Sequence, residues 1–189
     1  MTLLSSFRKG EHMADDGRVY LDAACLAKYL SAFSKDGHNF DPSSYSLSLS
    51  FYTGDSIGIC QDANYAYVLS KRYDHDFVTA ALMGFDINDF VADIRQIQGA
   101  YSRHYALKPF RWERMLLRIA LDEFSEEGFS QARIQPAEKN KYWLLPFPDD
   151  GRRIDIEEHR SRLRLRYNVT ARRSGFRFDE QLGCYVRDL

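Results

Sequence analysis

Apolar and polar residues follow one another along this chain with two different periods, and each period predicts a kind of element. In residues 20–33 apolar side chains recur every three or four positions, which is typical of an amphipathic helix. From Tyr45 to Phe51 they alternate with serines, which predicts a half-buried strand. The chain therefore begins with a helix and changes to β-structure before residue 50.

Three further apolar segments follow, at residues 65–72, 76–86 and 89–99. The turns between them are the short polar sequences Tyr-Asp-His-Asp and Asp-Ile-Asn-Asp. Connections this short favour an antiparallel meander. Residues 57–60 are a candidate for one more short strand before it.

After the meander the period becomes helical again. Residues 110–127 carry one continuous apolar stripe, and residues 129–136 are a short strand candidate. Asp155 resembles the first residue of a capping box, and the helix that it opens is expected to end at Gly175. Residues 176–186 predict a final strand or hairpin.

Composition places this pattern in one globular domain. The chain has 189 residues, of which 44% are hydrophobic and 28% charged, and this excludes a disordered chain, a collagen-like fibre and a disulfide scaffold. No run approaches the roughly 20 apolar residues of a membrane helix, so we expect no membrane association. We predict a flexible segment at residues 1–18 and a single domain at 19–189.

The net charge of −1 hides an uneven distribution. Residues 1–107 hold 9 basic and 13 acidic side chains, whereas residues 108–189 hold 17 and 14. Nine arginines fall between Arg152 and Arg177. The near-zero total disfavours bulk nucleic-acid binding, but the basic half is either a solvated helix face or a surface for one anionic ligand.

Cysteine and histidine suggest no special chemistry. Cys25, Cys60 and Cys184 are scattered and form no CxxC pair, and the five histidines show no ligand spacing. We therefore expect no metal site. The N-terminal residues lack the apolar segment of a signal peptide, so the expected compartment is the cytoplasm.

Two sequence blocks carry a family resemblance. The first is FVADIRQIQG followed by WERMLLRIALDEFSEEGFSQARIQP, in which Leu116, Leu117, Ala120, Phe124 and Gly128 fit the pattern LLxxAxxxhxxxG. The second is RYNVTARRSGFRF with its Gly-Phe pair. Both resemble the GCN5-related N-acetyltransferase superfamily over about residues 65–187. The resemblance implies an α+β fold with a mostly antiparallel mixed sheet flanked by helices, preceded here by an N-terminal helical extension.

The resemblance also implies a substrate, acetyl-CoA or another acyl-CoA, and an amine acceptor. In this superfamily the fourth strand of the sheet separates from the fifth, and its free backbone groups bind the pantetheine arm. On this chain that role falls on Ile97, Gln98 and Gly99. The phosphates would lie against the following loop and helix, where Arg103, Lys108 and Arg111 are the candidate ligands.

The chain departs from the family pattern in two places. Lys108, Arg111 and Glu113 occupy the motif positions of the phosphate loop, so both loop glycines are absent. Ala171 stands where the family has a tyrosine that acts as general acid, and Tyr167 lies one turn earlier. Tyr167 is either a substitute general acid or a buried amphipathic tyrosine.

A candidate base is Asp93, which with Arg95 forms either a site pair or a cross-strand pair facing solvent. The first hypothesis is therefore an acyl-CoA-dependent N-acyltransferase. The alternative is a non-catalytic domain of the same fold that binds a protein or an anionic partner. An unrelated α+β fold with a small-molecule pocket is the third hypothesis, and the sequence leaves a homodimer open.

Overall fold

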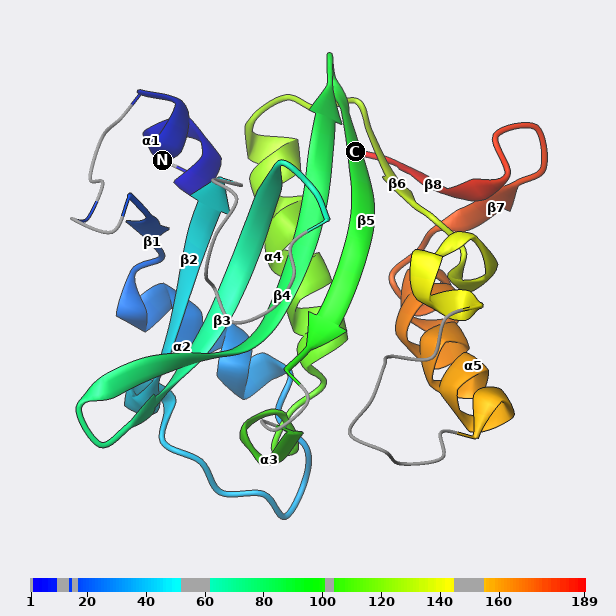
Figure 1. Ribbon diagram of the computed structural model, residues 1–189. Coiled ribbons are helices and arrows are strands. Elements are labelled where there is room, and N and C mark those ends of the chain that lie inside the picture. Colours follow the sequence, from blue (N-terminus) through cyan, green and yellow to red (C-terminus); the bar gives the residue numbers. More distant parts are fainter. Residues whose placement is uncertain (1, 10–13, 15–16, 52–61, 101–103, 145–154) are drawn as a thin grey trace.

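A computed structural model describes residues 2–9, 14, 17–51, 62–100, 104–144 and 155–189. Figure 1 shows a mixed sheet with helices packed against it. The strands are β1 Val19–Tyr20, β2 Tyr45–Phe51, β3 Tyr65–Tyr73, β4 Asp76–Asn88, β5 Val91–Gly99, β6 Gln131–Ile134, β7 Arg177–Asp179 and β8 Cys184–Asp188. The α-helices are α1 Leu3–Lys9, α2 Ala23–Ala32, α3 His104–Leu107, α4 Trp112–Glu126, α5 Ile156–Arg164 and α6 Thr170–Arg173. Single 3-10 turns span Pro42–Ser44, Ala137–Lys139 and Lys141–Trp143.

The sheet has eight strands in the order β1-β2-β3-β4-β5-β6-β8-β7. Strands β2 to β5 form the predicted antiparallel meander, and β5 pairs with β6 in parallel. Strand β8 is antiparallel to both β6 and β7. The expected α+β class with a mixed sheet flanked by helices is thus confirmed, whereas the candidate strand at residues 57–60 lies outside the described residues.

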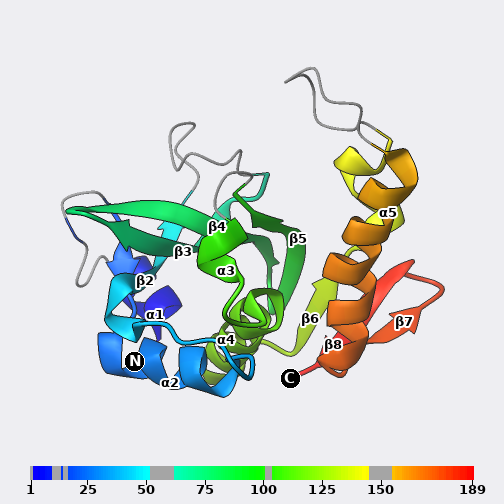
Figure 2. The same cartoon turned by 90° about the horizontal axis from the view of Figure 1, so that it is seen from below.

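Helix α4 supplies the centre of the hydrophobic core. Its predicted apolar stripe is buried along its length, and Phe124 is fully enclosed. The ring of Phe124 lies edge-on to Phe85 of β4 at 5.0 Å between centroids, and Phe85 stacks on Tyr67 of β3 at 5.2 Å. Helices α1, α2 and α4 all cover one face of strands β2 to β5 (Figure 2). Gly128, at φ 76°, ends α4 in the left-handed conformation that glycine accepts without strain.

Part of the amino-terminal segment forms a helix that packs on the core. Residues 3–9 form α1, and Leu3 and Leu4 are buried in the main core. The backbone N–H of Leu4 donates to the Glu123 carboxylate of α4 at 3.2 Å. Two adjacent leucines are too few for a periodic signal, so this docking depends on the partner surface that α4 provides.

The alternation of side chains between the two faces of β5 is shifted by one residue at Arg95. Phe85 of β4 pairs with Ile94, but Gly84 pairs with Gln96, so Arg95 is an extra residue in the ladder, a β-bulge. Pairing with β6 also stops there, because Ile94 and Ile134 are the last partners. A bulge increases local twist, and β5 then continues to Gly99 without β6 beside it. From Arg95 to Gly99, β5 therefore has β4 on one side and no pairing with β6 on the other, and we call this end of the ladder the opening between β5 and β6.

None of the helices in the described part of the chain is both long and apolar enough to span a membrane.

Candidate functional site

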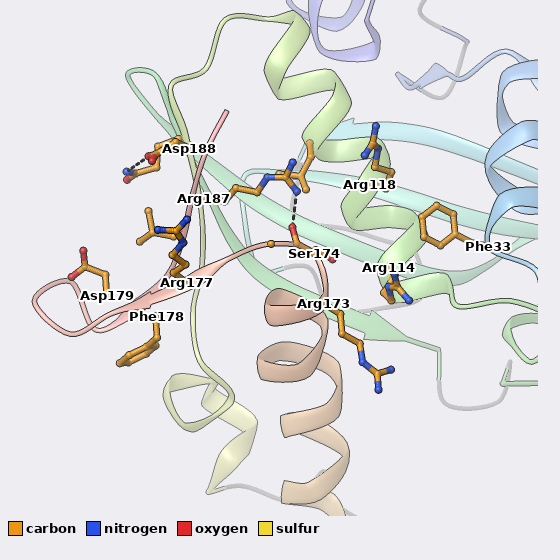
Figure 3. Close-up of a pocket in the computed structure, with 14 residues that line it drawn as sticks. Phe33, Arg114, Arg118, Arg173, Ser174, Arg177, Phe178, Asp179, Arg187 and Asp188 are labelled. Atoms are coloured by element: carbon orange, nitrogen blue, oxygen red, sulfur yellow. Dashed lines mark hydrogen bonds between the residues drawn. The ribbon is translucent and has the colours of Figure 1, made fainter.

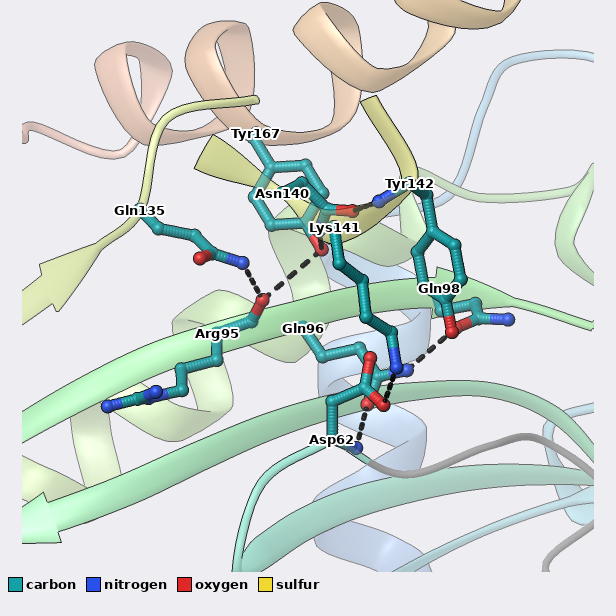
Figure 4. A network of polar contacts seen from close by, with 9 residues as sticks. All are labelled: Asp62, Arg95, Gln96, Gln98, Gln135, Asn140, Lys141, Tyr142 and Tyr167. Carbon is teal, nitrogen blue, oxygen red and sulfur yellow. Dashed lines mark hydrogen bonds and ion pairs between the residues drawn. The ribbon is translucent and has the colours of Figure 1, made fainter. Parts of the chain in front are cut away.

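The opening between β5 and β6 receives a side chain from the opposite helix. Helices α5 and α6 form one continuous helical segment, interrupted at Leu165–Val169 by a π-helical turn. Tyr167 lies in this turn, is 2% exposed, and points its hydroxyl at the β5 backbone (Figure 4). π-turns are rare and occur often at functional sites. Here the wider turn carries the tyrosine that the sequence offered as a substitute general acid.

The Tyr167 hydroxyl sits among defined hydrogen-bond partners. It accepts the backbone N–H of Ile97 at 3.0 Å and a side-chain N–H of Asn140 at 2.8 Å. Its own proton faces the carbonyl of Arg95 at 3.4 Å, which is long for an O–H donor. Burial raises the pKa of Tyr167 to about 12, although the N–H of Ile97 opposes this by favouring the phenolate. At neutral pH the group is therefore a protonated phenol with a weakly engaged proton.

A polar network continues from this point across the face of β5 (Figure 4). The Gln96 side chain, 1% exposed, accepts the backbone N–H of Asp62 at 2.9 Å and donates to the Gln98 side chain at 2.7 Å. The Asp62 carboxylate forms an ion pair with Lys141 of the last 3-10 turn. The network thus links β5 to the segment before β3 and to the connection after β6.

The backbone groups of the predicted pantetheine-binding residues point in two directions. The N–H of Ile97 points into the opening, and that of Gly99 points the same way because strand direction repeats every two residues. The backbone of Gln98, one residue between them, faces its partner Leu82 of β4. A Cβ on Gly99 would lie 3.0 Å from Leu107 and 3.4 Å from Trp112. Glycine therefore lets the strand end fit closely against the start of α4.

The predicted phosphate ligands lie at the start of α4. Some backbone groups there already form hydrogen bonds within the chain. Lys108 and Arg111 are exposed. The N–H of Arg111 donates to the carbonyl of Phe33 at 2.9 Å, and the carbonyl of Lys108 accepts the Lys35 ammonium at 3.1 Å. The two cationic side chains remain on the surface, but the Arg111 amide is not free for a ligand. Arg103 lies outside the described residues.

Glu113 adds a negative charge to the same helix end. Burial raises its pKa, and the nearby guanidinium of Arg166 opposes the rise. Arg166 lies over the ring of Trp112, 5.6 Å from its centroid. Two opposite charges that influence each other therefore lie at the helix end that would face the phosphates in the family.

Asp93, the predicted base, lies apart from this group. Its backbone is the register partner of Arg133 in the paired part of the β5–β6 ladder. Its carboxylate accepts a hydrogen bond from the Asn88 side-chain amide at 2.7 Å. Arg95 forms its ion pair with Asp86 at 2.7 Å instead. The bulge explains the difference, since it places Arg95 out of phase with the strand positions before it.

Sequence reasoning missed two members of the site, Gln96 and Asn140. Ala92, Ile94 and Ile97 hold the signal for the bulge, because the apolar spacing lengthens from two residues to three. No local pattern marks Asn140, which is 6% exposed and comes into contact with Tyr167 only through the fold.

Among the described residues, no cluster of three or more histidine, cysteine, aspartate or glutamate side chains is arranged to hold a metal ion.

Comparison with protein-family models, with curated proteins and with solved structures finds no match to this chain. The function proposed below therefore depends on the geometry of the opening and on the sequence blocks described above.

Proposed function

We propose that this chain is an acyl-CoA-dependent N-acyltransferase with a fold like that of the GCN5-related superfamily. The observation that carries the proposal is the end of the β5–β6 pairing at the Arg95 bulge, with the Tyr167 hydroxyl bonded to the β5 backbone just beyond it. The sheet order and the single parallel pair β5–β6 are consistent with the resemblance. The thioester of the acyl-CoA substrate would enter where β5 has no neighbouring strand.

The chemistry needs a polarised carbonyl and a proton for the leaving sulfur. In this proposal the outward N–H of Gly99 donates to the thioester carbonyl oxygen. The acceptor amine attacks the carbonyl carbon, the C–N bond forms and the C–S bond breaks. The sulfur takes the phenolic proton of Tyr167, water accepts the surplus proton of the amine, and the phenolate regains a proton from water. The N–H of Ile97 and the Asn140 amide stabilise the phenolate while it exists.

Titration calorimetry with acetyl-CoA and a longer-chain acyl-CoA tests binding, and release of free thiol in the presence of an amine tests transfer. We expect Tyr167→Phe to retain binding and to lower kcat by about 100-fold, the scale of general acid catalysis. Tyr185→Phe is the matched control, because Tyr185 is also buried and its hydroxyl accepts only from Arg172 among the described residues. Absence of binding with both acyl-CoA substrates would contradict the proposal.

A second function, a non-catalytic domain of the same fold that binds a protein or an anionic partner, is favoured by one observation. The outward N–H of Ile97 is already bonded to Tyr167, and the N–H of Arg111 to Phe33. Both groups would serve a ligand in the transferase. This alternative predicts no thiol release with any amine, and it is excluded if turnover is observed and Tyr167→Phe removes it.

A further inference from the structure

A second concave site lies away from the opening, behind the sheet between α4 and the β7–β8 hairpin (Figure 3). Its volume is about 850 Å³, which is within the range of small-molecule sites. None of the residues that line it belongs to the polar network around Tyr167. It therefore needs an explanation other than acyl transfer.

Arginine dominates this pocket. Arg114 and Arg118 come from α4, Arg173 from the end of α6, Arg177 from β7 and Arg187 from β8. The arginines thus come from two sides, one helical and one formed by the hairpin and the helix that precedes it, and Figure 3 shows their guanidinium groups pointing in different directions. Like charges gathered in a concave surface create a focused positive potential.

The carboxylates in the pocket offset only part of this charge. Asp179 accepts the backbone N–H of Leu182 at 2.9 Å, and Asp188 accepts the Gln131 side chain at 3.4 Å. Both are the only acidic residues that line the pocket within the described part of the chain. Five arginines therefore face two aspartates whose hydrogen bonds go elsewhere.

Several guanidinium groups are left with capacity to bind. Across the described residues, Arg173 and Arg177 form no ion pair, and the buried Nε of Arg114 has no hydrogen-bond partner. Arg118 pairs with Asp122 at 2.9 Å, and Arg187 donates to the Ser174 carbonyl at 2.6 Å. A buried unpaired donor is costly unless a ligand satisfies it.

We propose that this pocket binds a small organic molecule that carries two linked phosphoryl groups. Arginine forks match phosphate oxygens in bidentate geometry, and arginines on two walls suit two anionic groups rather than one. Phe178, 50% exposed, adds an apolar ring to the lining for the organic part of the ligand. The pocket and the acyl-CoA opening are assigned to different ligands, so this proposal goes beyond the proposed function.

Titration calorimetry with inorganic pyrophosphate, orthophosphate, ADP and citrate tests the proposal. We expect pyrophosphate and ADP to bind at least about tenfold more tightly than orthophosphate or citrate, since a charge-assisted contact contributes about 1.5 to 3 kcal/mol. Equal affinity for all four anions would overturn the proposal, and so would absence of binding.

The variant Arg173→Gln/Arg177→Gln tests the location. Both side chains are exposed and neither forms an ion pair among the described residues, so the double substitution breaks no ion pair of the fold. We expect it to weaken pyrophosphate binding by at least about tenfold. The control is Lys28→Gln/Arg72→Gln, which removes the same charge from exposed positions that also form no ion pair among the described residues. An equal loss in the control would show a bulk-charge effect and contradict a built pocket.

Acetyl-CoA titrated into protein saturated with pyrophosphate separates the two proposals. Unchanged acetyl-CoA affinity supports two ligands in two places. Competition would place the diphosphate of acetyl-CoA in this pocket and overturn the separate site. If acetyl-CoA fails to bind while pyrophosphate binds, the proposed function is wrong and the present inference stands.

Discussion

At the scale of single side chains, Glu123 is a buried acidic residue that joins α1 to α4. It is 8% exposed on α4 and accepts the backbone N–H of Leu4. Burial raises its pKa to about 7, against the opposing hydrogen bonds from the Leu4 and Leu3 amides. The folded protein therefore favours the neutral carboxyl, and the contact between α1 and α4 depends on pH.

The sign of this effect follows from linkage. A raised pKa means that the folded state binds a proton more tightly than the unfolded chain, so the stabilisation is complete below about pH 4.5. It is lost as pH rises through about 7, by about 3 kcal/mol in total. We expect Glu123→Gln to flatten the decline in the free energy of unfolding between pH 5 and 8, measured by urea denaturation.

The control for this substitution is Glu180→Gln, which removes one exposed carboxylate from the β7–β8 turn. It should reproduce the pH profile of the unsubstituted chain. A Glu123→Gln protein whose stability still falls with pH as steeply as that of the control would show that another group causes the decline.

Helix α5 positions Tyr167, so its stability matters at the scale of secondary-structure elements. The Asp155 carboxylate caps this helix by accepting the backbone N–H groups of Glu157 at 2.9 Å and Glu158 at 3.1 Å. The sequence predicts this cap at Asp155. The side chain of Glu158, the second member of the predicted capping box, forms its ion pair with Arg162 instead.

We expect Asp155→Ala to lower the free energy of unfolding by about 1 kcal/mol, because it leaves two amides of the first turn without their acceptor. Amide hydrogen exchange should become faster over the first turn of α5. Asp155→Asn keeps an acceptor oxygen and should stay close to the unsubstituted chain. Equal effects of the two substitutions would assign the stabilisation to charge instead of hydrogen bonding.

Elements with a regular period were predictable from the sequence, and the irregular ones were not. The serine alternation of β2 and the stripe of α4 each require one face to be buried, so both were found. The bulge at Arg95 and the π-turn around Tyr167 each add one residue to a regular ladder or helix. Such insertions are stabilised by contacts distant in the sequence, here with β4 and β5, and the candidate site depends on both.

At the scale of the whole molecule, the uneven charge of the chain has a structural correlate. Among the described arginines of the basic half, five line the pocket beside β7 and β8 and three lie on α5. The opening at β5 lies between the meander and this basic half (Figure 1). The fold thus holds the polar network around Tyr167 and a separate arginine-rich pocket, and all lining residues of the pocket except Phe33 come from the basic half.

The most direct test of the central claim is the amide spectrum of isotope-labelled protein during titration with acetyl-CoA. The account predicts shifts of the Ile97 and Gly99 resonances, whose N–H groups face the opening, while Val91 and Ala92 in the closed ladder stay unchanged. Absence of any shift at Ile97 and Gly99, or shifts confined to the residues around Arg173 and Arg177, would contradict it.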